Sequence, residues 1–308
     1  MDSNLNKTEN VSNSCTLLFD VGGTFLKALV ADSAGNLIPE SEFSVPMPSD
    51  GSRQEIVGAL TTSVVRGADF AKQHGLRIAG LGIDFPGPFD YNAGIPRMDH
   101  KFQAVYGENL KALLQDMPEI GAEVPVMFMH DVNAALLGEM VYGKARGCAN
   151  AALVTLGTGL GFACCLNGEI QTSELGSPRI SIFKRPYMDG ILEDYVSKRG
   201  FTCLYKQYSA EEADGITVAE IAAKAFAGDE AARKAFAEAG RILGEAIAPV
   251  LSENSIERLL LGGQISKSFE LFAPTLREAL KGVASLSVVD QAEHLTGAPF
   301  YGLMAAVR

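Results

Sequence analysis

Residues 16–32 read TLLFDVGGTFLKALVAD, and this stretch decides the fold. An apolar run leads to Asp20, two glycines interrupt the pattern at Gly22 and Gly23, and a second apolar run follows. The pattern predicts a strand, a tight turn and another strand, with glycines that are free to adopt positive φ. A Walker loop or a dinucleotide fingerprint has other glycine spacings and opens a helix, so both are excluded.

This turn has the groups that bind a phosphate. The backbone N–H groups of Gly22 and Gly23 and the hydroxyl of Thr24 can donate to phosphate oxygens. Asp20, at the end of a buried strand, would place a carboxylate where a hydrated Mg²⁺ that bridges the phosphates is held. A plain hairpin with a glycine turn explains the same residues, and this stretch alone does not choose between the two.

The composition fits a globular chain with two domains. The chain has 308 residues, is 47% hydrophobic and carries a formal net charge of −11. This charge repels nucleic acid and anionic lipid, so we expect neither nucleic acid nor a membrane as a partner. The polar first 15 residues do not form a signal peptide and no apolar run has the length of a membrane span, which predicts a cytoplasmic protein. The five cysteines lack metal-ligand spacing and are expected to be reduced, mostly buried thiols.

Strands and helices alternate along the first half of the chain. Apolar residues at helical spacing predict a helix from about 52 to 74 and a short helix at 110–114. Buried strands are expected at 78–85 and 124–129, and we expect residues 90–106 between them to form a long, irregular and polar loop. This order favours a mixed α/β sheet covered by helices.

The opening pattern returns in the middle of the chain. Residues 152–170 repeat the order of apolar strand, glycine turn and apolar strand, and aligning Gly22 with Gly157 sets Asp20 opposite Thr155. Two such units indicate a duplicated architecture. Further helices are expected near 190–199 and after a capping box at Thr217 and Glu220. Residues 229–252 are expected to form one long helix or two. A third strand-to-glycine junction precedes a helix expected over 266–280, and the last helix is expected from 298.

Six motifs, taken together and in order, resemble the ROK sugar kinases (repressor, open reading frame, kinase) of the actin-like ATPase and sugar-kinase superfamily. The motifs are DVGGT at 20–24 and LGTGLG at 156–161 (phosphate loops), HDVNAALLGE at 130–139 (catalytic segment), SELGS at 173–177 and LEDYVS at 192–197 (sugar segments), and LLLGGQIS at 259–266 (adenosine segment). The resemblance covers most of the chain. It implies a two-lobed, actin-like (duplicated ribonuclease H-like) α/β fold with a ligand cleft between the lobes: residues 1–126, with the helix at 298–308 packing back on them, and residues 127–297.

The resemblance also implies transfer of the γ-phosphoryl group of ATP to a sugar hydroxyl, with Mg²⁺ as cofactor and Asp131 as the general base. A carboxylate that leaves a buried strand and caps a helix starting at Val132 is rigid and can take the proton of a hydroxyl. Capping alone also explains Asp131, and the two roles are compatible. The expected ATP and phosphate residues are Asp20 (holding Mg²⁺ through water), Gly22, Gly23, Thr24, Lys27, Thr158, Gly159, Gly262 and Gly263. The expected substrate residues are His130, Glu174, Glu193, Asp84 and Lys101, while Glu139 is expected mainly on an exposed helix face.

The chain departs from the family at its zinc site. Most members hold a structural zinc with a His and three cysteines, but Ser177 replaces the His here and residues 177–193 contain no cysteine, so we expect no zinc. Cys164 and Cys165 cannot substitute, because neighbouring residues of a strand face opposite ways. We expect the 177–190 loop to be held instead by packing and by ion pairs, from Phe183, Pro186, Tyr187, Lys184 and Arg185.

The residues expected to contact sugar differ too. His130 stands where the family has Asn, and GIPRMDHKF at 94–102 replaces the family's NLPGW-like loop, so glucose is not assumed as the acceptor. Each unpaired group would disfavour a mismatched sugar by about 1–3 kcal/mol. Lys101 and its neighbours fit a charged sugar or simply a solvated loop. Asp84 lies in an apolar strand and needs a partner, either in the cleft or in the neighbouring turn.

Two other function classes compete with a kinase. One is a sugar- or nucleotide-binding regulator without turnover, and the other is an actin-like filament protein. About 15 residues precede the first strand, which is too few for the DNA-binding domain of the family's transcription factors. A filament protein would not need Glu174 and Glu193. The acceptor sugar, the hydroxyl that is phosphorylated and the formation of a homodimer stay open.

Overall fold

The computed structural model describes residues 13–209 and 215–307, so the first 12 residues lie outside it. The chain divides between Met129 and His130 into two compact units, and residues 306–308 belong to the first unit. No helix among the described residues is long and apolar enough to cross a bilayer.

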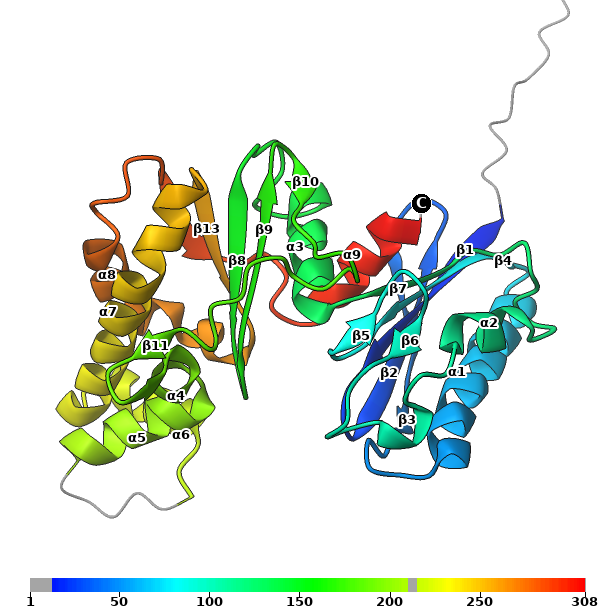
Figure 1. The fold of residues 1–308 in the computed structure, drawn as a ribbon, viewed down its shortest axis with the longest axis horizontal. Coiled ribbons are helices and arrows are strands. Elements are labelled where there is room, and N and C mark those ends of the chain that lie inside the picture. Colours follow the sequence, from blue (N-terminus) through cyan, green and yellow to red (C-terminus); the bar gives the residue numbers. More distant parts are fainter. Residues whose placement is uncertain (1–12, 210–214, 308) are drawn as a thin grey trace, which may run out of the picture. The chain divides into compact units, whose positions relative to one another are not determined.

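The first unit is built on a five-stranded mixed sheet (Figure 1). Its strands, in the order β3-β2-β1-β4-β7, are β1 (Ser14–Val21), β2 (Phe25–Asp32), β3 (Leu37–Pro46), β4 (Arg77–Asp84) and β7 (Val126–Met129). Strand β1 pairs antiparallel with β2 and parallel with β4. The predicted hairpin is therefore confirmed, and its first strand is the centre of the sheet.

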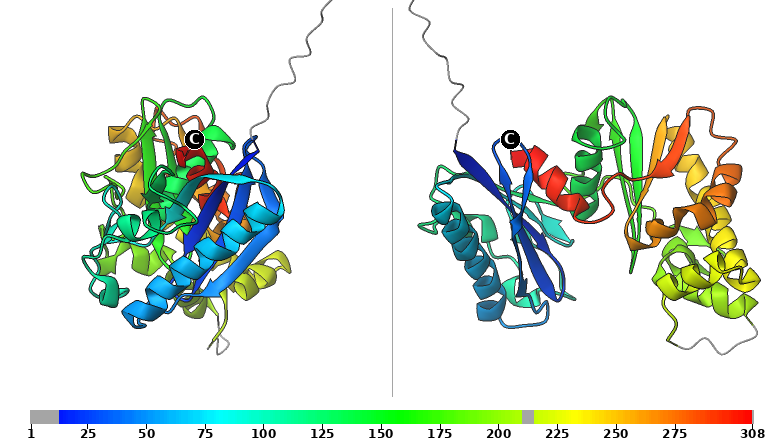
Figure 2. Two further views of the ribbon diagram at one scale, coloured as in Figure 1. Left: turned by 90° about the vertical axis from the view of Figure 1, so that its right-hand side faces the viewer. Right: turned by 180° about the vertical axis from the view of Figure 1, so that it is seen from behind.

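Helix α1 (Arg53–Gln73) lies against one face of this sheet, as Figure 2 shows. Ser52 begins it with a capping box, in which Ser52 accepts from the Glu55 N–H and the Glu55 carboxylate accepts from the Ser52 N–H. Its apolar stripe, which includes Ile56, Leu60 and Val64, is buried in the core of the first unit. These bounds match the prediction because both signals, the cap and the stripe, are local.

Residues 90–106 are largely irregular, as the sequence predicted, but they are not a uniformly polar loop. They contain the end of β5 (Phe89–Asp90), strand β6 (Ile95–Pro96) and a 3₁₀ turn at Gln103–Val105. Apolar anchors, among them Met98 and Phe102, are at most 1% exposed. The anchors are spaced too widely to show a strand or helix period, which is why the polar residues between them dominated the prediction. Helix α2 (Leu110–Gln115) follows where it was expected.

The second unit repeats the first in its strand order. Its strands, in the order β10-β9-β8-β13-β14, are β8 (Ala151–Leu156), β9 (Leu160–Leu166), β10 (Glu169–Ile170), β13 (Arg258–Gly262) and β14 (Val288–Gln291). In both sheets the first strand is central, antiparallel to the second and parallel to the fourth. Asp20 and Asp84 are register partners in the first sheet, as Thr155 and Gly262 are in the second. The expected duplication is present at this level.

Helices cover both faces of the second sheet. They are α3 (Asp131–Val141), α4 (Leu192–Val196), α5 (Lys198–Tyr208), α6 (Val218–Phe226), α7 (Glu230–Glu253) and α8 (Phe269–Ala279). Helix α9 (Ala298–Val307) packs on α3, where Gly302 lies against Ala134. The capping box at Thr217 and Glu220 is confirmed, and residues 229–252 form one helix rather than two. Two predictions were wrong in detail. The region 190–199 holds the whole of the short helix α4 and the start of α5, and the segment expected as a helix over 266–280 begins with a 3₁₀ turn at Gln264–Ser268 before α8.

The two cysteines of β9 face opposite sides, as the strand period predicted. Cys164 packs in the core with α7 and α8, whereas Cys165 packs in the smaller core with α3. Burial raises the pKa of the Cys164 thiol to about 11. Across the described residues the cysteines are free thiols; Cys15 is also buried and Cys203 is exposed.

The 177–190 loop is held mainly by packing. Ile182 is 1% exposed, a two-stranded hairpin joins β11 (Pro186–Tyr187) to β12 (Gly190–Ile191), and the Tyr187 ring meets Tyr195 edge to face at 5.1 Å. The prediction that Lys184 or Arg185 forms an ion pair was wrong. Lys184 lies over the Phe183 ring instead, 5.3 Å from its centroid, and within the described chain neither Lys184 nor Arg185 pairs with a carboxylate.

Candidate active site

The first glycine turn joins β1 to β2 and exposes its backbone. The Gly22 N–H donates to the Phe25 carbonyl at 2.9 Å and closes the turn. Gly23 and Thr24 are exposed, and in the described part of the chain their N–H groups donate to no protein acceptor. The glycines do not adopt positive φ, so that expectation was wrong. Glycine serves for close approach instead: a Cβ on Gly22 would lie 3.0 Å from the Phe25 carbonyl oxygen.

A neighbouring loop fixes this turn from behind. The Met47 N–H donates to the Thr24 carbonyl at 2.8 Å, and the Ser49 N–H donates to the Gly23 carbonyl at 3.2 Å. The carbonyl groups of the turn are therefore engaged while its N–H groups face outward. This is the arrangement that an anion needs.

Two carboxylates stand at the entrance to the turn. Asp84 is 1% exposed and its Oδ1 accepts the Val21 N–H at 3.0 Å, so it holds the end of β1. Asp20 is partly exposed and lies between Asp84 on β4 and Lys27 on β2 as their register partner. Of the two explanations offered for Asp84, hydrogen bonding beside the turn is the one that the contacts show.

His130 and Asp131 begin helix α3 in the second unit. The helix starts at Asp131 and its N-cap is His130, so the prediction that Asp131 caps a helix starting at Val132 was wrong by one residue. The Asp131 Oδ1 nevertheless accepts the Val132 N–H at 2.7 Å and lies 2.6 Å from His130 Nδ1. Because Nδ1 is also 3.4 Å from the Val132 nitrogen, the shorter contact identifies Nδ1 as a donor to the carboxylate.

The Asp131 carboxylate is fixed by one oxygen and open at the other. Its side chain is 64% exposed, and within the described residues Oδ2 has no hydrogen-bond partner. Desolvation by nearby protein opposes ionisation, but the hydrogen bond and charge of His130 and the Val132 N–H outweigh it and lower the pKa of Asp131. The carboxylate is thus ionised at neutral pH and has a free oxygen that can accept a proton.

The second glycine turn, between β8 and β9, resembles the first. The Gly157 N–H donates to the Gly159 carbonyl at 3.1 Å, while the N–H groups of Thr158 and Gly159 donate to no acceptor in the described chain. The Glu193 Oε2 accepts the Leu160 N–H at 2.9 Å, and a Cβ on Gly159 would lie 3.0 Å from that oxygen. Glu193, expected to contact sugar, therefore also braces this turn.

A hollow of about 520 Å³ opens beside the second turn. Thr158 and Glu193 line it together with side chains that the sequence reasoning missed, Lys198, Arg199, Thr202 and Lys206. The Lys198 N–H also donates to the Gly157 carbonyl at 2.8 Å. These residues lie on α5, where basic side chains resemble an ordinary solvated helix face, so no sequence pattern marked them as site residues.

The third junction packs directly against the second turn's strand. Gly263 has φ +82°, and a Cβ there would lie 2.4 Å from the Leu156 carbonyl oxygen, so this position needs glycine twice over. Gly262 is the register partner of Thr155. The junction and the second turn are thus neighbours. From the sequence alone, Gly262-Gly263 could be either a nucleotide site or a plain strand-to-helix turn.

The SELGS loop lies beside the first turn of α3. The buried Asn133 donates from Nδ2 to the Gly176 carbonyl at 3.2 Å, which ties the loop to the helix that bears Asp131. Glu174 is exposed in this loop. Glu139, expected on an exposed face, is 1% exposed and accepts the N–H groups of Lys144 and His294 at 2.9 and 2.8 Å, so its role is structural.

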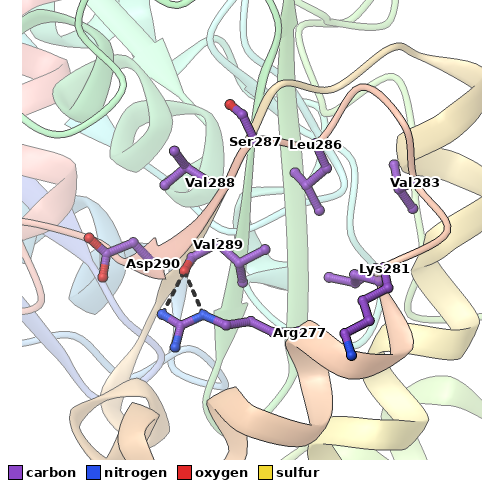
Figure 3. Close-up of a pocket in the computed structure, with 9 residues that line it drawn as sticks. Arg277, Lys281, Val283, Leu286, Ser287, Val288, Val289 and Asp290 are labelled. Atoms are coloured by element: carbon purple, nitrogen blue, oxygen red, sulfur yellow. Dashed lines mark hydrogen bonds between the residues drawn. The ribbon is translucent and has the colours of Figure 1, made fainter.

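One further hollow lies away from these groups. Figure 3 shows this hollow of about 520 Å³ between the end of α8 and β14, where Arg277 donates to the Val289 carbonyl at 3.2 and 2.9 Å. No predicted site residue lines it. Over residues 13–209 and 215–307, no three His, Cys, Asp or Glu side chains form a metal-binding group.

Comparison with known proteins connects these turns to one family. The glucokinase of Halalkalibacterium halodurans is 25% identical over 299 residues, covering 89% of this chain and 87% of its own. The structure of a Streptomyces griseus ROK family glucokinase in complex with glucose and AMPPNP matches with a TM-score of 0.76 at 23% identity, covering 95% of this chain and 99% of that one. A ROK family transcriptional regulator, described as a homolog of the E. coli MLC protein, matches with a TM-score of 0.81 at 19% identity, covering 97% and 79%.

These structural matches identify the fold as the two-lobed, actin-like fold. The sequence model of the ROK family matches residues 16–179 and 186–304, a span that includes both glycine turns, Asp131 and the Gly262-Gly263 junction. The chain belongs to the ROK family.

Proposed function

We propose that this protein is an ATP-dependent sugar kinase with Asp131 as its general base. The sugar hydroxyl oxygen forms a bond to the γ phosphorus, the bond from that phosphorus to the ADP oxygen breaks, and the hydroxyl proton passes to the Asp131 carboxylate. The observation that carries the proposal is the geometry of Asp131, with Oδ1 held by His130 and Val132 and Oδ2 open. Such a base contributes about 10²–10⁴-fold to the rate.

The two glycine turns supply the phosphate donors in this proposal. Each has outward N–H groups, at Gly23 and Thr24 and at Thr158 and Gly159, and phosphoryl transfer depends chiefly on aligning the phosphates and stabilising their charge. The basic side chains beside the second turn fit a polyphosphate in a chain whose net charge is −11. Adenosine is proposed at Gly262-Gly263, and the exposed Glu174, with Glu193 and His130, as sugar acceptors.

Asp20 is the residue proposed to hold Mg²⁺ through water. Mg²⁺ in such sites keeps several waters and uses one or two carboxylates plus phosphates, so the lack of a larger ligand cluster among the described residues fits it. The ion supplies charge neutralisation at the phosphate oxygens. The partial exposure of Asp20 at the end of β1, where it is the register partner of Asp84 and Lys27, supports this role. We also propose that the protein acts in the cytoplasm.

The experiment measures ADP release from Mg-ATP over a panel of hexoses, amino sugars, glycosides and sugar acids. With the best acceptor, Asp131→Asn should lower kcat by about 10²–10⁴-fold. Asp69→Asn is the matched control, because Asp69 is an exposed carboxylate inside α1, and it should leave turnover unchanged.

The alternative is a regulator of the same fold that binds sugar or nucleotide without turnover. Two observations support this alternative. The chain is similar to a ROK family transcriptional regulator, and His130 and Ser177 replace residues that the family uses to contact sugar. If no acceptor gives ADP release that depends on Asp131, while calorimetry still detects sugar or nucleotide binding, the kinase proposal is wrong and the regulator is supported.

A further inference from the structure

One lysine lies at the first glycine turn, close to Gly23. The Lys101 Nζ is 3.8 Å from the point that a Cβ of Gly23 would occupy, and the Ser49 Oγ is 3.5 Å from the same point. Lys101 was expected to contact the sugar because it lies in the 94–102 loop. The structure sets its ammonium group beside Gly23, in the turn whose N–H groups are proposed to bind phosphate.

Main-chain hydrogen bonds keep this lysine beside the turn. The Ser49 N–H donates to the Gly23 carbonyl at 3.2 Å, and the Phe102 N–H donates to the Ser49 carbonyl at 2.5 Å. Phe102 is 0% exposed, and its ring lies 4.8 Å from that of Phe85. The residue next to Lys101 is therefore anchored in the core and linked to the turn through Ser49, so the backbone of Lys101 stays near Gly23 and its side chain can reach the turn.

The charges around Lys101 leave its ammonium available to an anion. Asp99 faces His100, with 3.5 Å between Oδ1 and Nδ1, and within the described residues Lys101 has no carboxylate at ion-pair distance. Lys101 and Ser49 line a hollow of about 350 Å³, to which Asp50 and Asp99 also contribute. An acidic rim disfavours an anion in the body of the hollow, so the favourable place is at the turn itself, between Nζ, the Ser49 hydroxyl and the bare N–H groups.

We propose that Lys101 contacts the terminal phosphoryl group of the nucleotide at the first glycine turn, and that it reads the donor rather than the sugar. This inference rests on the proposed kinase function. The charge of the transferred group is spread over its oxygens in the transition state, where a lysine acts as a mobile point charge. The contact distinguishes a nucleoside triphosphate from a diphosphate, because the diphosphate lacks the group that Lys101 touches.

The test compares Lys101→Met with the wild type by calorimetry, using AMPPNP and ADP with Mg²⁺. Lys101→Met should weaken AMPPNP binding by about 10- to 100-fold and leave ADP binding unchanged, and kcat should fall by a similar factor while the KM for the acceptor stays constant. Lys101→Arg should restore most of both losses. Lys72→Met, an exposed lysine in the last turn of α1, is the matched control and should change nothing.

The outcomes separate this inference from the kinase proposal. If Lys101→Met raises the KM for the acceptor and leaves AMPPNP binding and kcat intact, Lys101 reads the sugar and the inference is overturned. Unchanged values throughout overturn it as well. If the wild type phosphorylates no sugar, the kinase proposal fails, but the AMPPNP and ADP comparison still decides the role of Lys101. A wild type that binds neither nucleotide overturns both.

Discussion

Asp131 shows how a single residue combines anchoring and reactivity. Its Oδ1 takes the Val132 N–H and the His130 ring, which fixes the carboxylate to the start of α3. The positive end of a helix also favours the ionised form. The arrangement lowers the pKa of Asp131 and leaves Oδ2 for the substrate. A weak base that is ionised at neutral pH is a consequence of this environment.

The first prediction concerns the acid side of the pH profile. Because the folded pKa of Asp131 is depressed, its ionised form persists below the usual carboxyl range, and kcat/KM should fall only as pH drops through that lowered value. His130→Ala removes the hydrogen bond and charge that lower the pKa, so the acid limb should move to higher pH. His130→Asn, which keeps a donor without the charge, should move it less.

The measurement is kcat/KM from about pH 2 to about pH 8, a range that reaches below the ordinary carboxyl pKa, with circular dichroism to confirm folding at each pH. The same shift should appear for Asp131 by carboxyl NMR. An acid limb that stays in place in His130→Ala would show that His130 does not set the ionisation of the base.

At this scale the sequence identified chemistry better than position. Asp131 and both glycine turns were predictable because each carries its own local signal, a carboxylate after a strand or glycines between apolar runs. Glu139 was predicted to be exposed and is buried, since its two N–H donors come from Lys144 and His294. Lys101 beside Gly23 could not be predicted either, because the contact joins residues 78 positions apart.

The elements around the second turn depend on backbones that approach closely. At Gly263 both the positive φ and the contact with the Leu156 carbonyl exclude a side chain. Gly58, inside α1, has no atom within 4 Å of its Cβ position. A side chain is thus excluded at Gly263 but has room at Gly58, so the two positions can be compared by the same substitution.

We predict opposite effects for alanine at these two positions. Gly58→Ala should stabilise the protein by about 0.4–1 kcal/mol, because it restricts the unfolded chain at no steric cost. Gly263→Ala should destabilise it by more than about 1 kcal/mol, because Leu156 must move and strain remains at φ. Urea unfolding followed by circular dichroism reports both. A neutral Gly263→Ala would mean that β8 yields easily, and nucleotide affinity should then be intact as well.

Elements were predictable where one signal spans many residues. α1 and α7 were placed to within a residue or two by a cap and a continuous apolar stripe. The segment 90–106 was not, because its anchors find their partners in an aromatic cluster with Phe85 and Phe128 that no local period reveals. The break between α4 and α5 at Ser197 had no proline or glycine to mark it.

At the scale of the whole molecule, one strand order serves two units. The same position of each sheet holds Asp20 and Asp84 in the first unit but Thr155 and Gly262 in the second. The acidic version suits a cation, and the neutral, small version suits the close approach of a ligand. The duplicated framework is thus the same while the chemistry at its centre differs.

This difference predicts how ligands should stabilise the chain. Mg²⁺ with AMPPNP should raise the thermal midpoint, and at 100 times the Kd the gain is about 2.7 kcal/mol. Asp20→Asn should reduce the part of the gain that requires Mg²⁺ and leave the part seen with AMPPNP and EDTA unchanged. Thermal melts with and without EDTA measure this. An equal, Mg²⁺-dependent gain in Asp20→Asn would remove Asp20 from the metal site.

The central place of β1 and β8 has a consequence for slow motions. Each is paired on both sides, and each ends in the turn proposed to bind phosphate, whereas β3, β7, β10 and β14 lie at the margins. Local opening begins where pairing is one-sided. The amides of the two middle strands should therefore be the last in their units to exchange with deuterium, and the margins can fray repeatedly without disturbing the geometry of either turn.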